Sequence, residues 1–339
     1  MSTDVPTPSN SSPELKSTAS ATTTSAKNGR PKIVLWGDSI TQMSSSALDS
    51  GFSAHLSDAY QRRADVYNRG YSGYNTDWFL SYCKTTEGYN DILTLGGIDH
   101  TASGKGKEKS SVELVTIFFG ANDASHHIHN KRQHVPLDKY KSNLKELIML
   151  ARKWYGQKVK IILMSPPPVY HAQRLQYQID RYGKEKATGI LERTLELSGE
   201  YAKVVGEVVN EAENENVAFL DLWTSMQEED KDGWSRFLSD GLHLSRDGNI
   251  FVGKALLQTI AKQFPQVAVH ADQQTGLWGN SASKCGEALE RFGPWHDEIN
   301  FEQEIFAKMK KFEKELEGGG NESLKRKRDE SIGDDKMEK

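Results

Sequence analysis

Gly37-Asp38-Ser39-Ile40-Thr41 follows directly on the apolar run Ile33-Val34-Leu35-Trp36. A short apolar run with β-branched residues, ended by a glycine turn, is typical of a strand buried on both faces of a parallel sheet. A side chain just past the carboxyl end of such a strand lies where open α/β sheets bind ligands. Ser39 is therefore the first candidate for a functional residue, although a Gly-x-Ser tripeptide alone also suits an ordinary turn.

Three further blocks occur in comparable places along the chain. Asn68-Arg69-Gly70-Tyr71-Ser72-Gly73 follows a short strand-like run over 65–67, and Gly120-Ala121-Asn122-Asp123 follows the clearest strand pattern, over 114–119. Asp240-Gly241-Leu242-His243 precedes a helical stretch. A serine, a glycine, an asparagine and an Asp-x-x-His, met in this order, form a pattern far more specific than any one of them.

The order of predicted elements favours a parallel sheet with helices on its faces, because it opens as strand, helix, strand, helix. We expect strands over 33–36, 65–67, 114–119, 159–164 and 217–222. We expect helices over 51–63, 76–82, 136–155 and 191–214, and from about 250 to 260, where apolar residues repeat at helical spacing.

The four blocks resemble those of the SGNH (GDSL-type) hydrolases, over roughly residues 32–264. The sequences of segments 68–76, 118–124 and 240–245 are especially similar to those of the isoamyl acetate-hydrolysing esterase group. The resemblance implies a three-layer α/β/α, flavodoxin-like fold with a central parallel sheet, and ester hydrolysis by a serine. It also implies short-chain esters such as acetates as substrates.

Carried over residue by residue, the resemblance implies a nucleophile at Ser39 and a triad completed by Asp240 and His243. It marks Gly73 and Asn122, together with Ser39, as the oxyanion hole. The chemistry agrees: a serine hydroxyl needs a nearby base to attack at neutral pH, and His243 oriented by Asp240 fits that role. Donors aimed at the developing oxyanion are commonly the largest single catalytic contribution.

One departure separates this chain from the α/β-hydrolases, whose nucleophile elbow reads Gly-x-Ser-x-Gly after a central strand. Here Thr41 stands two residues beyond Ser39, and the serine follows what is predicted to be the first strand. Both facts favour the GDSL-type fold.

Composition constrains the domain organisation and the class of partner less tightly than the motifs do. The 339 residues carry a net charge of −4 and 36% hydrophobic residues, which suits one large core with polar tails and does not indicate nucleic-acid binding. Residues 1–30 are rich in Ser, Thr, Pro and Ala, and 318–339 are highly charged, so we expect disordered tails around a catalytic domain over 31–264. The remaining stretch, 265–317, is predicted to be a C-terminal extension with an amphipathic helix that could dock on the domain or pair with a second subunit as a homodimer.

Residues 1–30 lack the apolar core of a secretory signal, no uncharged apolar run is long enough to span a membrane, and Cys83 and Cys285 give no disulfide framework. We therefore expect a cytoplasmic protein. The basic run Lys325-Arg326-Lys327-Arg328 has the composition of a nuclear localisation signal. Acidic residues follow it directly, however, so a solvated tail is favoured.

Two further stretches could suggest additional sites. His126-His127-Ile128-His129 follows Asn122, but no carboxylate or cysteine pattern completes a metal site, so we predict a solvated loop, with no metal and no cofactor. Residues 96–111, rich in Gly, Ser and Lys, are predicted to be a surface insert rather than a lid.

Two alternatives to a carboxylic esterase remain open. A thioesterase or a carbohydrate deacetylase would use the same oxyanion site, and the residues do not separate these substrates. A non-catalytic binding module would need the crevice but not the complete set of Ser39, Asp240, His243 and oxyanion donors.

Overall fold

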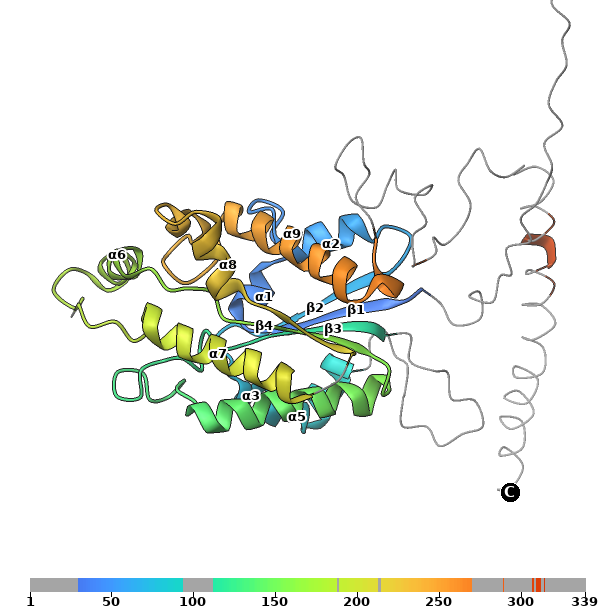
Figure 1. Ribbon diagram of the computed structural model, residues 1–339, viewed down its shortest axis with the longest axis horizontal. Coiled ribbons are helices and arrows are strands. Elements are labelled where there is room, and N and C mark those ends of the chain that lie inside the picture. The colour runs from blue at the N-terminus through green and yellow to red at the C-terminus, as the bar shows by residue number, and fades with distance from the viewer. Residues whose placement is uncertain are drawn as a thin grey trace, which may run out of the picture.

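The computed structural model describes residues 30–93, 112–187, 189–212 and 215–269, together with isolated positions from 289 onward. Within these residues the strands form one parallel sheet in the order β2-β1-β3-β4-β5 (Figure 1). They are β1 (Lys32–Gly37), β2 (Asp65–Gly70), β3 (Val112–Phe118), β4 (Lys160–Met164) and β5 (Val217–Leu220). This strand order is that of flavodoxin-like sheets, so the predicted α/β fold with a central parallel sheet is confirmed.

Helices cover both faces of the sheet and make three layers (Figure 1). One layer contains α1 (Ser39–Met43), α2 (Phe52–Ala59), α8 (Leu222–Glu229) and α9 (Arg246–Gln263). The other contains α3 (Thr76–Cys83), α5 (Leu137–Tyr155) and α7 (Leu195–Ala212). β1 serves both cores, since Ile33 and Leu35 pack in the first and Val34 and Trp36 in the second. A strand buried on both faces explains its uninterrupted apolar run.

The remaining elements are short or peripheral. They are α4 (Thr86–Gly88), the π-helical turn η2 (Tyr89–Leu93), α6 (His171–Tyr182) and the 3₁₀ turns η3 (Trp234–Phe237) and η4 (Pro265–Val267). Neither α6 nor α8 is predicted from the sequence. In α6 Arg174 alone is buried, so the helix lacks the wide apolar stripe on which such a prediction depends.

Several boundaries differ from the predicted ones for local reasons. α2 ends at Ala59 rather than near Arg63, because the chain turns away at Arg62, whose φ of 61° is left-handed. β2 continues to Gly70, which pairs with Gly37 of β1. α7 begins at Leu195 rather than at 191, where the Thr194 hydroxyl accepts from the Leu197 N–H at 3.2 Å. A threonine in this position caps a helix and so marks its start.

The packed core continues past residue 264, where we predicted the catalytic domain to end. Val267, Ala268 and Val269 are buried with the α2–α9 core, and the Tyr60 hydroxyl donates to the Val267 carbonyl at 2.8 Å. The tail before residue 30, the insert over 96–111, the tail over 318–339 and most of the predicted helix over 295–320 lie outside the described residues. Those predictions remain predictions.

No helix in the described part of the chain combines the length and the apolar character needed to cross a bilayer.

Candidate active site

Three of the four sequence blocks meet at the carboxyl ends of neighbouring strands. Ser39 follows β1, the loop over 71–75 follows β2, and Asn122 follows β3. The loop after β2 is held against the end of β1 and against α1, because Tyr71 N–H donates to the Gly37 carbonyl at 2.9 Å and Ser72 N–H to Gln42 Oε1 at 2.8 Å. Parallel pairing of β1 with both β2 and β3 thus brings residues far apart in sequence to one edge.

Ser39 is the first residue of α1 and is 8% exposed. Asp38 caps this helix, its Oδ1 accepting from the Ile40 N–H at 2.9 Å. The turn requires a glycine before it, since a Cβ at Gly37 would lie 2.0 Å from the Thr41 hydroxyl oxygen and 2.8 Å from the Phe118 carbonyl. Helix capping and this close approach set the position of the serine side chain.

The fourth block supplies a base and a carboxylate. Ser39 Oγ lies 2.9 Å from His243 Nε2, and His243 Nδ1 lies 2.9 Å from Asp240 Oδ2. An ionised carboxylate can only accept, so Nδ1 carries the proton and Nε2 is left to accept from the serine hydroxyl. The three side chains therefore form one hydrogen-bonded chain in the order that nucleophilic catalysis requires.

A tight loop presents Asp240 and His243 together, as their two-residue separation suggested. Leu238 and Leu244 form an isolated antiparallel bridge, and Ser239 N–H donates to the His243 carbonyl at 2.8 Å. Within the loop, Asp240 Oδ1 accepts from the Leu242 N–H at 3.0 Å and the His243 N–H at 2.8 Å. His243 thus lies in the loop before α9 rather than on the helix.

The Asp240 carboxyl is held ionised. Burial acts to raise its pKa, but the hydrogen bonds from His243, the electrostatic interaction with that imidazole and the charge of Arg174 outweigh burial, and the pKa lies well below its usual range. Arg174 Nη1 donates to Asp240 Oδ2 at 2.9 Å, and the arginine side chain is 9% exposed. Arg174 comes from α6, so this helix contributes the charge that faces the carboxylate.

Gly73 and Asn122 are brought together at the same edge. The Asn122 amide Nδ2 donates to the Tyr74 carbonyl at 2.9 Å, next to Gly73. Gly73 has a φ of +80°, in the left-handed region. A Cβ at this position would not be crowded, since the nearest described protein atom outside the adjoining chain would be Gln133 Nε2, at 3.7 Å. Backbone conformation, rather than crowding by protein atoms, therefore explains the glycine. Among the described residues, neither Ser39 N–H nor Gly73 N–H has an acceptor, so both can serve a substrate oxygen.

Sequence reasoning missed three residues that contact this set. Arg174 contacts Asp240, while Gln133 and Arg193 both contact Oδ1, the side-chain amide oxygen of Asn122. Gln133 and Arg193 lie in loops, and Arg174 lies on α6, which lacks a wide apolar stripe. A single sequence also does not distinguish a buried arginine from an exposed one.

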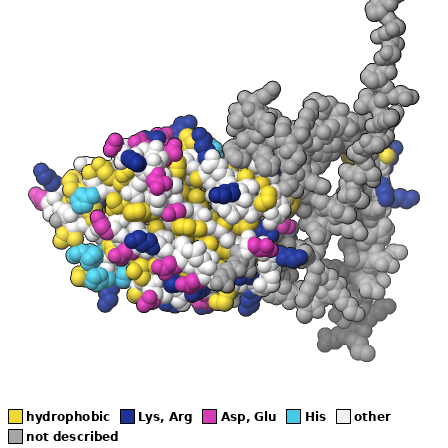
Figure 2. Space-filling model, viewed as in Figure 1, with side chains coloured by type: hydrophobic (Ala, Val, Ile, Leu, Met, Phe, Trp, Pro, Cys, Tyr) yellow, Lys and Arg dark blue, Asp and Glu magenta, His cyan; other side chains and the backbone are white. Residues whose placement is uncertain are grey.

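The histidines after Asn122 lie in a turn, as predicted, with His127 and His129 exposed. The rings of His126 and His127 stack at 4.6 Å, and Figure 2 shows histidine side chains gathered at one end of the surface. Among the described residues no group of three or more His, Cys, Asp or Glu side chains has an arrangement that could hold a metal ion.

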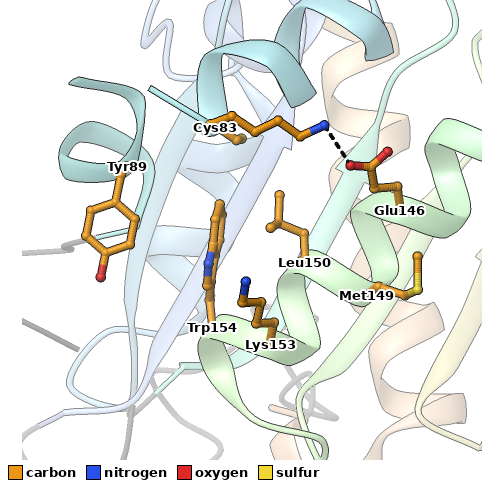
Figure 3. Close-up of a pocket in the computed structure, with 8 residues that line it drawn as sticks. Cys83, Tyr89, Glu146, Met149, Leu150, Lys153 and Trp154 are labelled. Atoms are coloured by element: carbon orange, nitrogen blue, oxygen red, sulfur yellow. Dashed lines mark ion pairs between the residues drawn. The ribbon is translucent and has the colours of Figure 1, made fainter. Parts of the chain in front are cut away.

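A pocket of about 700 Å³ lies on another part of the molecule, between the α3–η2 segment and α5 (Figure 3). The Lys84–Glu146 ion pair, at 2.9 Å, crosses one side of it. It is lined by Cys83, Lys84, Tyr89, Glu146, Met149, Leu150, Lys153 and Trp154. None of these is a predicted site residue, so this pocket does not belong to the serine site.

The chain is similar to known proteins in both sequence and structure. The family model for GDSL-like lipase/acylhydrolase matches residues 33–256. A GDSL esterase/lipase of Arabidopsis thaliana is 39% identical over 245 residues, covering 72% of this chain and 89% of the relative. An isoamyl acetate-hydrolyzing esterase 1 homolog of Bos taurus is 37% identical over 233 residues, covering 69% and 82%. A crystal structure of the lipase/acylhydrolase from Enterococcus faecalis superposes with a TM-score of 0.47 at 25% identity, covering 68% and 96%.

The family model spans more than half of the chain, and the relatives are matched over most of their own length. The chain therefore belongs to the GDSL-like lipase/acylhydrolase family and is a carboxylic-ester hydrolase.

Proposed function

We propose that this protein hydrolyses short-chain carboxylic esters, acetate esters among them, through an acyl-enzyme on Ser39. One observation carries the proposal: Ser39 Oγ, His243 and Asp240 form a continuous hydrogen-bonded chain with both contacts at 2.9 Å. The acetate preference is supported by the name of the Bos taurus relative, an isoamyl acetate-hydrolyzing esterase 1 homolog.

In the proposed reaction, His243 Nε2 takes the proton of the Ser39 hydroxyl as Oγ attacks the ester carbonyl. Asp240 keeps the imidazole in the required tautomer and stabilises the imidazolium that forms. His243 then returns the proton to the leaving alcohol, and a water activated in the same way releases the acid. No cofactor or metal is invoked in these steps.

The negative oxygen of each tetrahedral intermediate would be stabilised by Ser39 N–H, Gly73 N–H and the Asn122 amide. These donors lie at the start of α1 and in the loops after β2 and β3, which are held together by hydrogen bonds. Donors positioned before the reaction need no reorganisation during it, and loss of one typically costs on the order of a hundredfold in rate.

The test is hydrolysis of nitrophenyl esters of increasing acyl length by the intact protein and by Ser39→Ala. We expect activity that falls with chain length and drops by about four to six orders of magnitude in the variant, because the nucleophile is lost. Ser57→Ala is the matched control, since this serine lies on α2 and donates only to the Ser53 carbonyl. Retained activity in Ser39→Ala would show that another residue is the nucleophile.

The acyl donor is tested separately. A thioacetate and an acetylated sugar, assayed beside nitrophenyl acetate, measure kcat/KM for the two alternative substrate classes. A preference of tenfold or more for either one would replace the short-chain ester in the proposal, while the role of Ser39 would stand.

A further inference from the structure

The Asn122 side-chain amide is held from its oxygen end by two donors. Asn122 Oδ1 accepts from Arg193 Nη2 and from Gln133 Nε2, each at 3.1 Å. We infer that Gln133 and Arg193 are positioning residues that fix the geometry of the oxyanion hole. This inference rests on the proposed function, because it concerns the donors that stabilise the tetrahedral intermediate.

Arg193 decides which end of the Asn122 amide faces the substrate. A guanidinium has only donors, so the amide must turn its oxygen toward Arg193 and its NH₂ group away. One N–H of that group donates to the Tyr74 carbonyl at 2.9 Å, and the second remains for the substrate oxygen. Arg193 is held in turn by its own contact with the Ala121 carbonyl at 2.9 Å.

Gln133 joins the two loops that carry the side-chain and glycine donors. Its Nε2 donates to the Gly73 carbonyl at 2.9 Å as well as to Asn122 Oδ1. Its Oε1 accepts from Arg193 Nη2 at 2.6 Å and Asn130 Nδ2 at 2.7 Å, so the orientation of the Gln133 amide is also determined by donors. A single side chain thereby ties the loop after β2 to the loop after β3.

Burial gives these contacts their importance. Arg193 is 6% exposed, and its ion-pair partner is Glu192, at 3.1 Å. Hydrogen bonds from a buried cation are strong and directional, and they polarise the Asn122 amide so that its free N–H becomes a better donor. Because the oxyanion exists only in the transition state and intermediate, loss of this alignment should lower kcat and leave KM nearly unchanged.

The first test is the pair of variants Gln133→Met and Gln133→Glu. Methionine keeps the length of the side chain without a hydrogen-bond donor, while glutamate also keeps the acceptors for Arg193 and Asn130. We expect kcat for nitrophenyl acetate to fall about 10- to 100-fold in both, with KM changed less than threefold. Gln227→Met is the matched control, because this half-buried glutamine donates only to the Trp223 carbonyl and should retain full activity.

Thermal unfolding of each variant shows whether it is folded, and a variant that melts below the assay temperature is replaced by the other of the pair. A kcat within twofold of the wild type in a folded variant would overturn the inference. A 10- to 100-fold loss in kcat/KM that came entirely from a higher KM, with kcat unchanged, would also overturn the inference, since it would indicate a substrate-binding role.

A double-mutant comparison tests whether Gln133 acts through Asn122. Asn122→Ala alone should lower kcat about 100-fold or more. If Gln133 orients that amide, adding Gln133→Met should cost clearly less than it does in the wild-type background. The same fold-loss in both backgrounds would show that Gln133 acts independently of Asn122 and would contradict the inference.

The two proposals fail in different ways. If the wild-type protein hydrolyses no ester and a fluorophosphonate does not label Ser39, the proposed function is wrong. If the wild type is active and labelled while the Gln133 variants match it in kcat, the proposed function stands and the positioning inference falls.

Discussion

At the scale of single residues, the pKa values of three carboxyl groups that belong to, or adjoin in sequence, the candidate site residues are shifted in opposite directions. The pKa of Asp240 is held low by its partners, whereas burial raises the pKa of Asp38 to about 6 and that of Asp123 to about 7. Asp123 Oδ1 accepts from the N–H and the hydroxyl of Thr76, but Oδ2 has no partner among the described residues. The difference follows from partners: Asp240 accepts from the Arg174 guanidinium as well as from His243, whereas Asp123 accepts from the neutral donors of Thr76.

Asp123 should therefore make stability depend on pH in the direction opposite to that of Asp240. Its folded pKa of about 7 exceeds the unfolded value near 3.8, so the folded state binds the extra proton and wild-type stability falls as pH rises between these values. Asp123→Asn removes that titration. We expect the unfolding free energy of Asp123→Asn minus that of the wild type to increase as the pH rises, by up to about 1.4 kcal/mol per pH unit between roughly pH 4 and 7.

Urea unfolding of both proteins at pH 4, 5, 6 and 7 measures this difference. Asp58→Asn is the control, because it makes the same substitution at an exposed position on α2. A difference between Asp123→Asn and the wild type that does not change with pH would show that Asp123 is ionised in the folded protein throughout this range.

At the scale of elements, α6 is unusual because it supports the site with little burial of its own. Its first turn is attached to the loop that carries Asp240 and His243 and to η3: Tyr170 N–H donates to the Gly241 carbonyl at 3.0 Å, and Gln173 Nε2 to the Ser235 carbonyl at 3.1 Å. Arg174 adds the contact with Asp240. Beyond Arg174, no residue of α6 is buried. The helix is thus anchored at one end.

We expect amide hydrogen exchange to divide α6 along these lines. The amides over 178–182 should exchange faster than those over 144–151 in α5, by a factor of 100 or more, because local opening costs little where few apolar contacts are lost. The buried side of α5, with Leu144, Leu147, Ile148 and Ala151, opens only with the core. Equal protection of the two segments, measured by mass spectrometry at peptide resolution, would contradict this account.

At the scale of the whole molecule, the core is closed by chain that follows α9. Phe264, Val267, Ala268 and Val269 are all buried, and the Val267 carbonyl accepts from Tyr60. The molecule therefore uses a segment beyond the predicted end of the catalytic domain to cover the α2–α9 layer. Burial of two valines and one tyrosine hydrogen bond of this kind is worth about 3 kcal/mol or more.

Two truncations test the contribution of this segment. A chain that ends at Val269 should be more stable than one that ends at Phe264 by about 3 kcal/mol in urea unfolding. Both lack everything after residue 269, so the comparison isolates the five residues between the ends. Identical midpoints would mean that the segment after Phe264 adds nothing to the fold.

The sequence by itself determined the strands, their class of sheet and the identity of the candidate catalytic residues. Uninterrupted apolar runs such as 33–36 and 114–119 are readable because strands buried on both faces tolerate few polar residues. Ser39, Gly73, Asn122, Asp240 and His243 are recognisable because each follows or closes an element at a fixed place in the order of blocks. The loop between Asp240 and His243 is short enough for the chain alone to keep the two together.

Only the tertiary structure decided which other side chains support these residues. Arg174 and Arg193 lie 66 and 71 residues from the side chains that they contact, and Gln133 lies 60 residues from Gly73, so these contacts depend on how loops and α6 pack at the sheet edge. Neither burial of an arginine nor the raised pKa of Asp123 leaves a periodic pattern in the sequence. Local spacing encodes secondary structure and short turns, whereas hydrogen bonds across 60 to 71 residues exist only once the sheet has assembled.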